Sequence, residues 1–215
     1  MSTETTAHAP SKRSDAKRSA IVVAATAAFL AQGYEAASMD AIAADANVSK
    51  RTVYNHFPSK RELFRAVTQR LYAGLLETDA LFAPAGEAPE TALPHLARAI
   101  LNHLRQPEVR GLLRLVIAEQ HRIPELAAEF QSAGKGPAVG HIEKYFSEAD
   151  AGGHLEVPDP LLAAQQFLGA IKESLFWPAL IGISTRKDED AVIAAATTMI
   201  LGTYANTKGA FQQKS

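Results

Sequence analysis

The length, composition and charge of this chain already exclude several classes of protein. Its 215 residues, 47% of them hydrophobic and none of them cysteine, suffice for a folded core and exclude disulfides and cysteine-based zinc sites. No apolar run reaches the roughly 18 residues that a membrane span requires, and the formal net charge is only -1, so we expect a cytoplasmic protein that does not enter a membrane.

The charge is unevenly distributed along the chain. Residues 12–70 carry ten Lys/Arg against five Asp/Glu, whereas residues 71–215 carry twelve against seventeen. A basic segment on an otherwise acidic protein is expected where one end meets phosphate and the other does not. The N-terminal part is therefore the candidate for binding nucleic acid.

The chain opens with a segment that lacks helical periodicity. Residues 1–13 are rich in Ser, Thr, Ala and Pro and end in two basic residues, which predicts a flexible basic arm. From Ser14 the pattern becomes helical, and one stripe contains Ile21, Ala25, Ala28, Phe29 and Gln32. Gly33 then supplies the C-terminal stop.

Two short helices are predicted next, each opened by a serine. Ser38 can cap a helix over residues 39–46, and Ser49 can cap another that runs to about residue 57. Asn47 between them tolerates the left-handed conformation of a sharp turn, and Pro58 ends the second helix. Residues 14–58 therefore predict a three-helix helix-turn-helix domain.

The rest of the chain predicts only helices. Ser59 and Glu62 form a capping box that opens a connecting helix over residues 59–81. Residues 82–215 then contain helical segments over residues 91–105, 107–121, 124–133, 137–151, 160–181 and 188–208. Thr91 is the expected cap of the first segment, which places Pro94 in a first turn. Loose connections are expected at residues 134–140 and 151–153. The expected fold is all-α, with a helix-turn-helix domain followed by a larger helical domain.

The second short helix has the content of a recognition helix. Its apolar residues, Val53 and Phe57, are four apart and mark the face turned toward the core. The other faces carry hydrogen-bonding or cationic side chains in close succession, at Lys50, Arg51, Thr52, Tyr54, Asn55 and His56. Such a helix can meet the edges of bases in a groove, although a short polar helix is more often a solvated surface element.

Two stretches together strongly resemble the DNA-binding domain of TetR family regulators. They are GYEAASMDAIA over residues 33–43 and NVSKRTVYNHFPSK over residues 47–60. The resemblance covers about residues 15–65, and only Ala37 and Asn47 depart from it, where that family usually has Thr and Gly. The remainder is similar to the AefR-like subgroup, best at RLVIAE over residues 114–119 with Pro124, Leu126 and Phe130 close behind.

This resemblance implies double-stranded operator DNA as the partner. Lys50 and Arg51, at the N-terminal end of the recognition helix, are expected to contact bases or phosphates, and Thr52 and Asn55 to lie nearer the bases. Tyr54 and His56 resemble the phosphate-gripping pair of that family. The implied DNA-binding residues are Ser38, Lys50, Arg51, Thr52, Tyr54, Asn55, His56 and Lys60.

A homodimer is expected because one helix-turn-helix reads only a few base pairs of a palindromic site. The last two helical segments repeat apolar or small residues three and four apart, which is typical of a helical seam. The residues assigned to the interface are Leu161, Ala164, Leu168, Ile171, Leu175, Val192, Ala196, Met199, Ile200 and Thr203. A seam internal to one chain is the alternative for about half of these residues.

The larger domain is also expected to bind a small hydrophobic or aromatic ligand. Polar and aromatic residues embedded in its apolar patterns are the candidates for the pocket lining, namely His103, Arg114, Glu119, His121, Phe146, Phe167 and Trp177. Each one taken singly has an ordinary alternative, because aromatics at helical spacing are mostly core and charged residues mostly face water.

The function expected from the sequence is a ligand-responsive repressor that needs no cofactor and no metal. Two alternatives stay open: a helical DNA-binding protein without ligand response, and an all-α enzyme. The enzyme alternative has little support, because the sequence contains no phosphate-binding glycine loop, no G-x-S-x-G elbow and no H-E-x-x-H.

Overall fold

The protein is described here by a computed structural model that covers residues 12–76, 87–184 and 186–205. Within these ranges it is built from α-helices, one π-helical turn and a single isolated bridge between Leu155 and Ala205, so the predicted all-α fold is confirmed. The first helix begins at Lys12, two residues earlier than expected, and the remainder of the predicted arm lies outside the described residues. None of the described helices is both long and apolar enough to cross a membrane.

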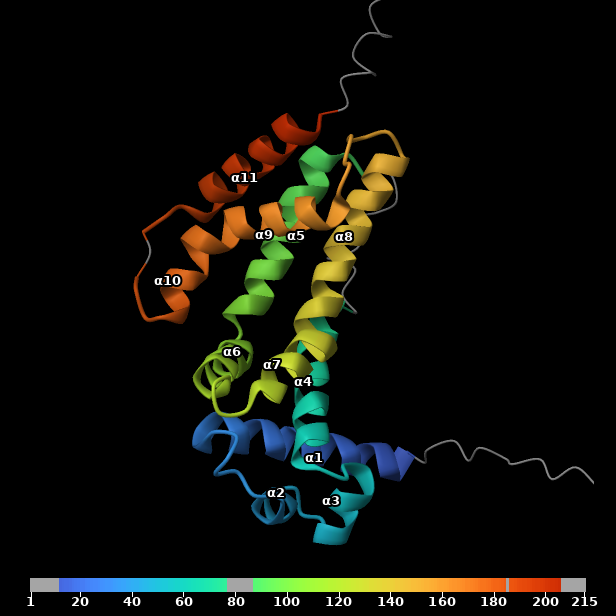
Figure 1. Cartoon of the computed structure of the whole chain (residues 1–215), viewed down its shortest axis with the longest axis vertical. Coiled ribbons are helices and arrows are strands. Elements are labelled where there is room, and N and C mark those ends of the chain that lie inside the picture. Colours follow the sequence, from blue (N-terminus) through green and yellow to red (C-terminus); the bar gives the residue numbers. More distant parts are fainter. Residues whose placement is uncertain (1–11, 77–86, 185, 206–215) are drawn as a thin grey trace, which may run out of the picture.

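A small helical unit occupies one end of the elongated molecule. It consists of α1 (Lys12–Gln32), α2 (Met39–Asp45) and α3 (Lys50–His56), and α4 (Lys60–Leu76) leads from it into the rest of the chain (Figure 1). The predicted stripe on α1 is buried from Ile21 to Phe29, whereas Gln32 at its end is exposed. Phe29 packs against Phe64 of α4 with ring centroids 5.9 Å apart, so α4 belongs to this core as well as to the next domain.

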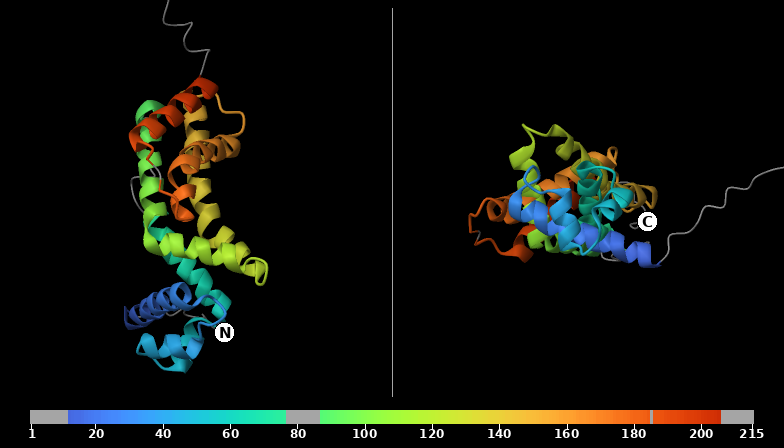
Figure 2. Two further views of the ribbon diagram at one scale, coloured as in Figure 1. Left: turned by 90° about the vertical axis from the view of Figure 1, so that its left-hand side faces the viewer. Right: turned by 90° about the horizontal axis from the view of Figure 1, so that it is seen from below.

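The larger domain forms the other end of the molecule (Figure 2). Four of its helices begin with proline, which has no amide hydrogen to lose in a first turn. Its elements are α5 (Pro89–Arg105), α6 (Pro107–Glu119), α7 (Pro124–Phe130), the π-helical turn η2 (Gln131–Lys135), α8 (Gly136–Ala151), α9 (Pro160–Leu175), α10 (Trp177–Leu180) and α11 (Glu189–Tyr204).

The predicted loose connection at residues 134–140 is wrong. The chain stays helical from Pro124 to Ala151, and η2 accommodates the glycines there by packing against α4 rather than by forming a loop. The predicted cap at Thr91 is also wrong, because α5 begins earlier, at Pro89 after Ala88. Pro94 therefore lies inside α5.

The two domains meet along α1 and α4. Helix α6 packs on α1, where Gly111 faces the side chain of Leu30, and α7 packs on α4 (Figure 1). At the second contact the buried carboxylate of Glu129 accepts a hydrogen bond from Nε of Arg61 at 2.7 Å and lies 3.8 Å from Nε of Arg65. The start of α4, next to α3, is thus tied directly to the larger domain.

Candidate nucleic-acid interface and ligand pocket

Local capping fixes the turn between α2 and α3 as predicted. The hydroxyl of Ser38 accepts a hydrogen bond from the amide of Ala41 at 3.1 Å, and the hydroxyl of Ser49 accepts one from the amide of Thr52 at 3.1 Å. Asn47 adopts a φ of 52°, the left-handed conformation that a sharp turn needs and that Asn tolerates better than most residues. The geometry of the two short helices therefore follows from local sequence.

Helix α3 divides into a buried and an exposed face. Val53 and Phe57 are 0% and 3% exposed and hold the helix on the core. Arg51, Tyr54 and Asn55 are exposed together on the opposite side, and among the described residues none of the three has a hydrogen-bond or ion-pair partner. Because α3 lies at the extreme end of the molecule (Figure 1), these side chains are free to enter a groove.

Other predicted DNA-binding residues flank this face with contacts of their own. The ammonium group of Lys50 forms an exposed ion pair with Asp40 at 2.8 Å, which also raises the pKa of Lys50 through the hydrogen bond. The hydroxyls of Thr52 and Ser49 are 2.8 Å apart. Exposed pairs of this kind are weak, so Lys50 can exchange its carboxylate partner for a phosphate.

Lys60 makes internal contacts that the sequence does not predict. Its ammonium group donates hydrogen bonds to the backbone carbonyls of Glu35 and Ala37, at 3.0 and 3.1 Å, and lies 4.7 Å from the centroid of the Tyr34 ring. Burial lowers the pKa of Lys60. These contacts join α4 to the turn before α2, and the expected phosphate contact of Lys60 stays a prediction.

Sequence reasoning missed Arg18. This residue of α1 lies over the ring of Phe57 at the end of α3, with the guanidinium carbon 5.1 Å from the ring centroid. His56 is half-buried beside the same ring, with centroids 6.3 Å apart. The signal that could have identified Arg18 is the basic spacing in the first turns of α1, at Lys12, Arg13, Lys17 and Arg18.

The predicted ligand residues do not form one cluster. Phe146 and Phe167 are both 0% exposed and pack on each other at 6.3 Å between ring centroids, so they belong to the solid core. Arg114 is exposed and donates a hydrogen bond to the carbonyl of Leu180 at 2.9 Å. His121 is exposed, and Glu119 is half-buried near Gly33 at the domain junction. These five assignments are corrected.

His103 and Trp177 do line cavities. His103 is 4% exposed, stacks edge-on against Tyr72 at 4.8 Å between ring centroids, and has no hydrogen-bond partner for Nε2 among the described residues. Burial lowers the pKa of His103 to about 4, so the ring is neutral at pH 7. Trp177 is 40% exposed at the rim of a larger cavity.

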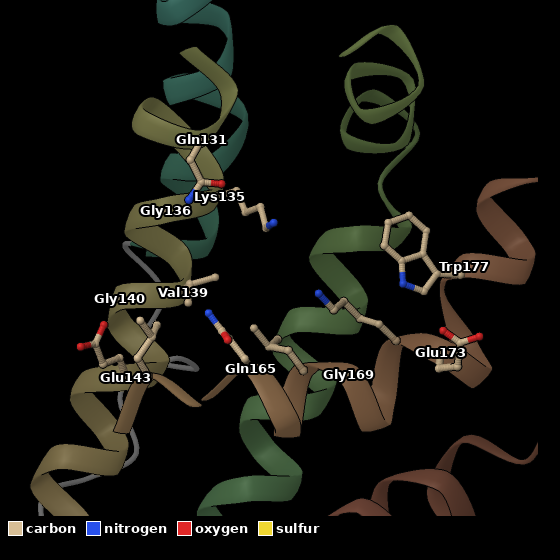
Figure 3. Close-up of a pocket in the computed structure, with 13 residues that line it drawn as sticks. Gln131, Lys135, Gly136, Val139, Gly140, Glu143, Gln165, Gly169, Glu173 and Trp177 are labelled. Atoms are coloured by element: carbon tan, nitrogen blue, oxygen red, sulfur yellow. The ribbon is translucent and has the colours of Figure 1, made fainter. Parts of the chain in front are cut away.

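The cavities lined by these two residues adjoin each other. An outer chamber of about 400 Å³ lies between η2, α8 and α9, where Lys135, Val139 and Glu143 face Gln165, Gly169 and Glu173 (Figure 3). An inner, mainly apolar chamber of about 60 Å³ is lined by residues of α4, α5, η2, α8 and α9. Four residues line both chambers, namely Lys135, Val139, Leu168 and Lys172.

Six residues assigned to the dimer interface lie inside the core of the single chain. Residues that are almost fully buried within one chain cannot form its surface, so the assignment is corrected for Ala164, Leu168, Ile171, Leu175, Ala196 and Ile200. The reason is that the predicted seam is the apolar face by which α9 packs on α8 and α11. Val192 is half-buried, and only Leu161, Met199 and Thr203 are exposed.

Large apolar side chains are exposed on α9, α10, the following turn and α11, helices of the larger domain that lie away from α3 (Figure 1). They are Leu161, Leu162, Trp177, Ile181, Ile183 and Met199, each at least 40% exposed. Small residues, Ala194, Ala195 and Gly202, are also exposed on α11. Because α10 and α11 both pack on α9, this apolar surface is a candidate interaction site.

Comparison with known proteins agrees with this geometry. Residues 21–67 match the family described as bacterial regulatory proteins, tetR family. Residues 91–206 match the family described as the AefR-like transcriptional repressor, C-terminal domain. The HTH-type transcriptional activator FasR of Mycolicibacterium smegmatis is 50% identical over 56 residues, which are 26% of each protein. The match thus spans about a quarter of the length of that relative.

Two solved structures resemble nearly the whole chain. A TetR-family transcriptional regulator from Mesorhizobium loti is 30% identical with a TM-score of 0.75, over 90% of this chain and 99% of that one. The flavonoid-responsive regulator FrrA is 31% identical with a TM-score of 0.74, over 87% and 96%. Proteins of this family are not enzymes, so the enzyme alternative is set aside. The chain belongs to the TetR family of bacterial transcriptional regulators and carries an AefR-like C-terminal domain.

Proposed function

We propose that this DNA-binding regulator is a ligand-responsive repressor that binds a palindromic operator as a homodimer in the cytoplasm. The observation that carries the proposal is the exposed face of α3, where Arg51, Tyr54 and Asn55 have no partner among the described residues. Residues 12–58 form the reading head, α4 is the connection, and the helices from α5 to α11 bind the ligand and the second subunit.

The side chains on this face match the edges of bases and the phosphates around them. Arg pairs best with guanine and Asn with adenine in the major groove, so Arg51 and Asn55 are the residues that specify the sequence. Phosphates are gripped from the flanks by Tyr54, Lys50 and Arg18, with Ser38, Thr52 and His56 close by, and these contacts position the protein without reading sequence.

The second subunit is proposed to cover the apolar surface over α9, α10 and α11. Two reading heads about 34–36 Å apart would contact successive major grooves on one side of the duplex. The helices that carry it lie away from α3 (Figure 1), so it can pair two chains while both copies of α3 stay free. Met199 and Leu161, both exposed, are residues of the predicted seam that remain in this interface.

Ligand response is proposed to act through α4. The two chambers are lined by helices of the larger domain, and Tyr72 and Leu75 of α4 line the inner one. The same helix starts beside α3 and is tied to α7 through Glu129. A ligand that favours a different tilt of α4 would change the spacing of the two heads, and couplings of this kind are about 1–3 kcal/mol.

The comparisons support repression and ligand response in different degrees. The description matched by the larger domain is that of a repressor, whereas FasR is an activator that matches only the first part of the chain. FrrA is described as flavonoid-responsive. We follow the repressor description matched by the larger domain, because this is the domain proposed to bind the ligand and the second subunit.

The test is a gel shift of the full chain on the DNA that precedes its own coding sequence. We expect Asn55→Ala to weaken this shift strongly and Asn102→Ala, which changes an exposed Asn on α5, to leave it unchanged. Equal binding by both variants would contradict the assignment of α3. Addition of a panel of small hydrophobic and aromatic compounds then separates a ligand-responsive regulator from a helical DNA-binding protein without ligand response, whose shift none of them alters.

A further inference from the structure

Two ammonium groups lie at the junction of the inner and outer chambers without a counter-charge. Lys135 ends η2 and Lys172 lies in the last turn of α9, and both line both chambers. Among the described residues neither ammonium has a hydrogen-bond or ion-pair partner. Lys135 is exposed and Lys172 is half-buried. A partly buried charge such as that of Lys172 is ordinarily paired in folded proteins.

The surroundings of Lys172 disfavour its charge. Burial lowers the pKa of Lys172, and the like charge of Lys135 lowers it further. An anion placed between the two ammonium groups would offset both effects, because an opposite charge within hydrogen-bond distance stabilises the protonated form. The site is therefore electrostatically complementary to an anionic group.

The carboxylates of the outer chamber do not occupy this position. Glu143 of α8 and Glu173 of α9 line the chamber, but their carboxylates lie toward its opposite edges, while the Lys135 side chain extends into the space between the helices (Figure 3). No ion pair between these glutamates and the two lysines is present in the described structure. The two ammonium groups thus have no carboxylate partner within the described part of the cavity wall.

The inner chamber is suited to an apolar group. Its wall is formed mainly by aliphatic side chains, including Leu75, Ile100 and Ile142, around a volume of about 60 Å³. Nε2 of the buried, neutral His103 is its unpaired polar atom. Because the two lysines line both chambers, an apolar chain in the inner chamber can place a charged end beside them.

We propose that the pocket binds an organic anion with an apolar tail, with a carboxylate held between Lys135 and Lys172 and the tail in the inner chamber against Ile100 and Ile142. The proposal rests on the proposed function, because it names the chemical class of the ligand that would act on the same pocket. Its position also links it to DNA, since η2 packs on α4.

The experiment measures binding of decanoate to the full-length protein by calorimetry and by the fluorescence of Trp177, the only tryptophan of the chain. Decyltrimethylammonium and 1-decanol carry the same chain with a positive or no charge, and 2-naphthoate carries the carboxylate on a fused ring. We expect decanoate to bind most tightly. Lys135→Met and Lys172→Met should each weaken it by about 10- to 100-fold, the worth of a charge-assisted hydrogen bond.

Matched variants keep the test decisive. Lys144→Met removes an exposed lysine of α8 that pairs with Glu148 away from the pocket, and it should leave decanoate affinity unchanged. Lys172→Glu should lose decanoate and gain decyltrimethylammonium, and circular dichroism checks that each variant folds. Equal affinity for the three decyl compounds, tighter binding of 2-naphthoate, or undetectable binding of decanoate would overturn the proposal.

These failures are distinguishable from a failure of the proposed function. The ligand-free gel shift of wild type and of the lysine variants is measured on the same preparations. An intact shift without decanoate binding overturns the ligand class alone, whereas a lost shift in the wild-type protein contradicts DNA binding itself.

Discussion

The packing of η2 on α4 predicts that a single methyl group at Gly134 destabilises the protein. A Cβ atom built there would lie 2.7 Å from Cδ2 of Tyr72 and 2.8 Å from Cγ2 of Thr68. Ordinary carbon contacts are about 3.5–4.0 Å, so the neighbours would have to retreat by about 1 Å. Tyr72 is held by the rings of His103 and Phe130, at 4.8 and 5.8 Å between centroids, and cannot retreat freely.

The magnitude follows from two opposing effects. Overpacking of a filled core costs about 1–3 kcal/mol, and replacing a helical glycine by alanine returns about 0.5–1 kcal/mol of backbone entropy. We therefore expect Gly134→Ala to lower the free energy of unfolding by about 1–2 kcal/mol. The displaced η2 should also weaken any ligand-induced release of DNA, because it lies between the pocket and α4.

Urea unfolding followed by circular dichroism measures this difference, and Gly74→Ala is the control. Gly74 lies in the same helix as Tyr72 and is exposed, and a methyl group added there would meet no atom within 4 Å. We expect this control to gain about 0.5–1 kcal/mol. If Gly134→Ala were as stable as Gly74→Ala, η2 would not be packed on α4 as described.

Three further predictions concern the pH dependence of stability, DNA binding and the dimer. Because burial lowers the pKa of His103 from 6.5 to about 4, the unfolded chain gains a proton that the folded chain does not as the pH falls between these values. His103 should therefore lower the free energy of unfolding of the wild type by up to about 3 kcal/mol over that range. In urea unfolding, the free energy of unfolding of His103→Phe should depend less on pH than that of the wild type; the same pH dependence in both would contradict this prediction. Asn55→Ala should relax the preference for one base position by about 1–3 kcal/mol, whereas Tyr54→Ala should weaken binding to all duplexes alike, as competition binding would show. The same effect of both variants across sequences would refute the distinction between base-contacting and phosphate-contacting residues. Met199→Asp should yield monomers in sedimentation while Ser147→Asp, exposed on α8, stays dimeric, and an unchanged dimer in both would place the interface elsewhere.

The reading head could be predicted because its geometry is set by near neighbours in the sequence. Ser38 and Ser49 cap amides three residues on, and Asn47 takes up its left-handed turn within two residues of a cap. The buried face of α3 followed from the spacing of Val53 and Phe57 alone. Capping and helical periodicity act over one turn, so the sequence displays them directly.

Contacts between distant segments could not be predicted in this way. The hydrogen bonds of Lys60 were not foreseen because its partners, the carbonyls of Glu35 and Ala37, lie far back in the chain. The seam on α9 marked an apolar face correctly but could not show whether another helix of the same chain or a second subunit covers it, as Ile171 illustrates. Lys135 and Lys172 come together only through the packing of η2 and α9.

Selection of random duplexes by the full-length protein tests the central claim most directly. The exposed face of α3 predicts enrichment of a two-fold symmetric motif whose half-sites are centred about 34–36 Å apart. An Arg51→Ala/Asn55→Ala double variant should lose this enrichment while it keeps salt-sensitive binding to unrelated DNA. Absence of any enriched motif, or the same motif selected by the wild type and the double variant, would contradict the account of α3 as the helix that reads operator sequence.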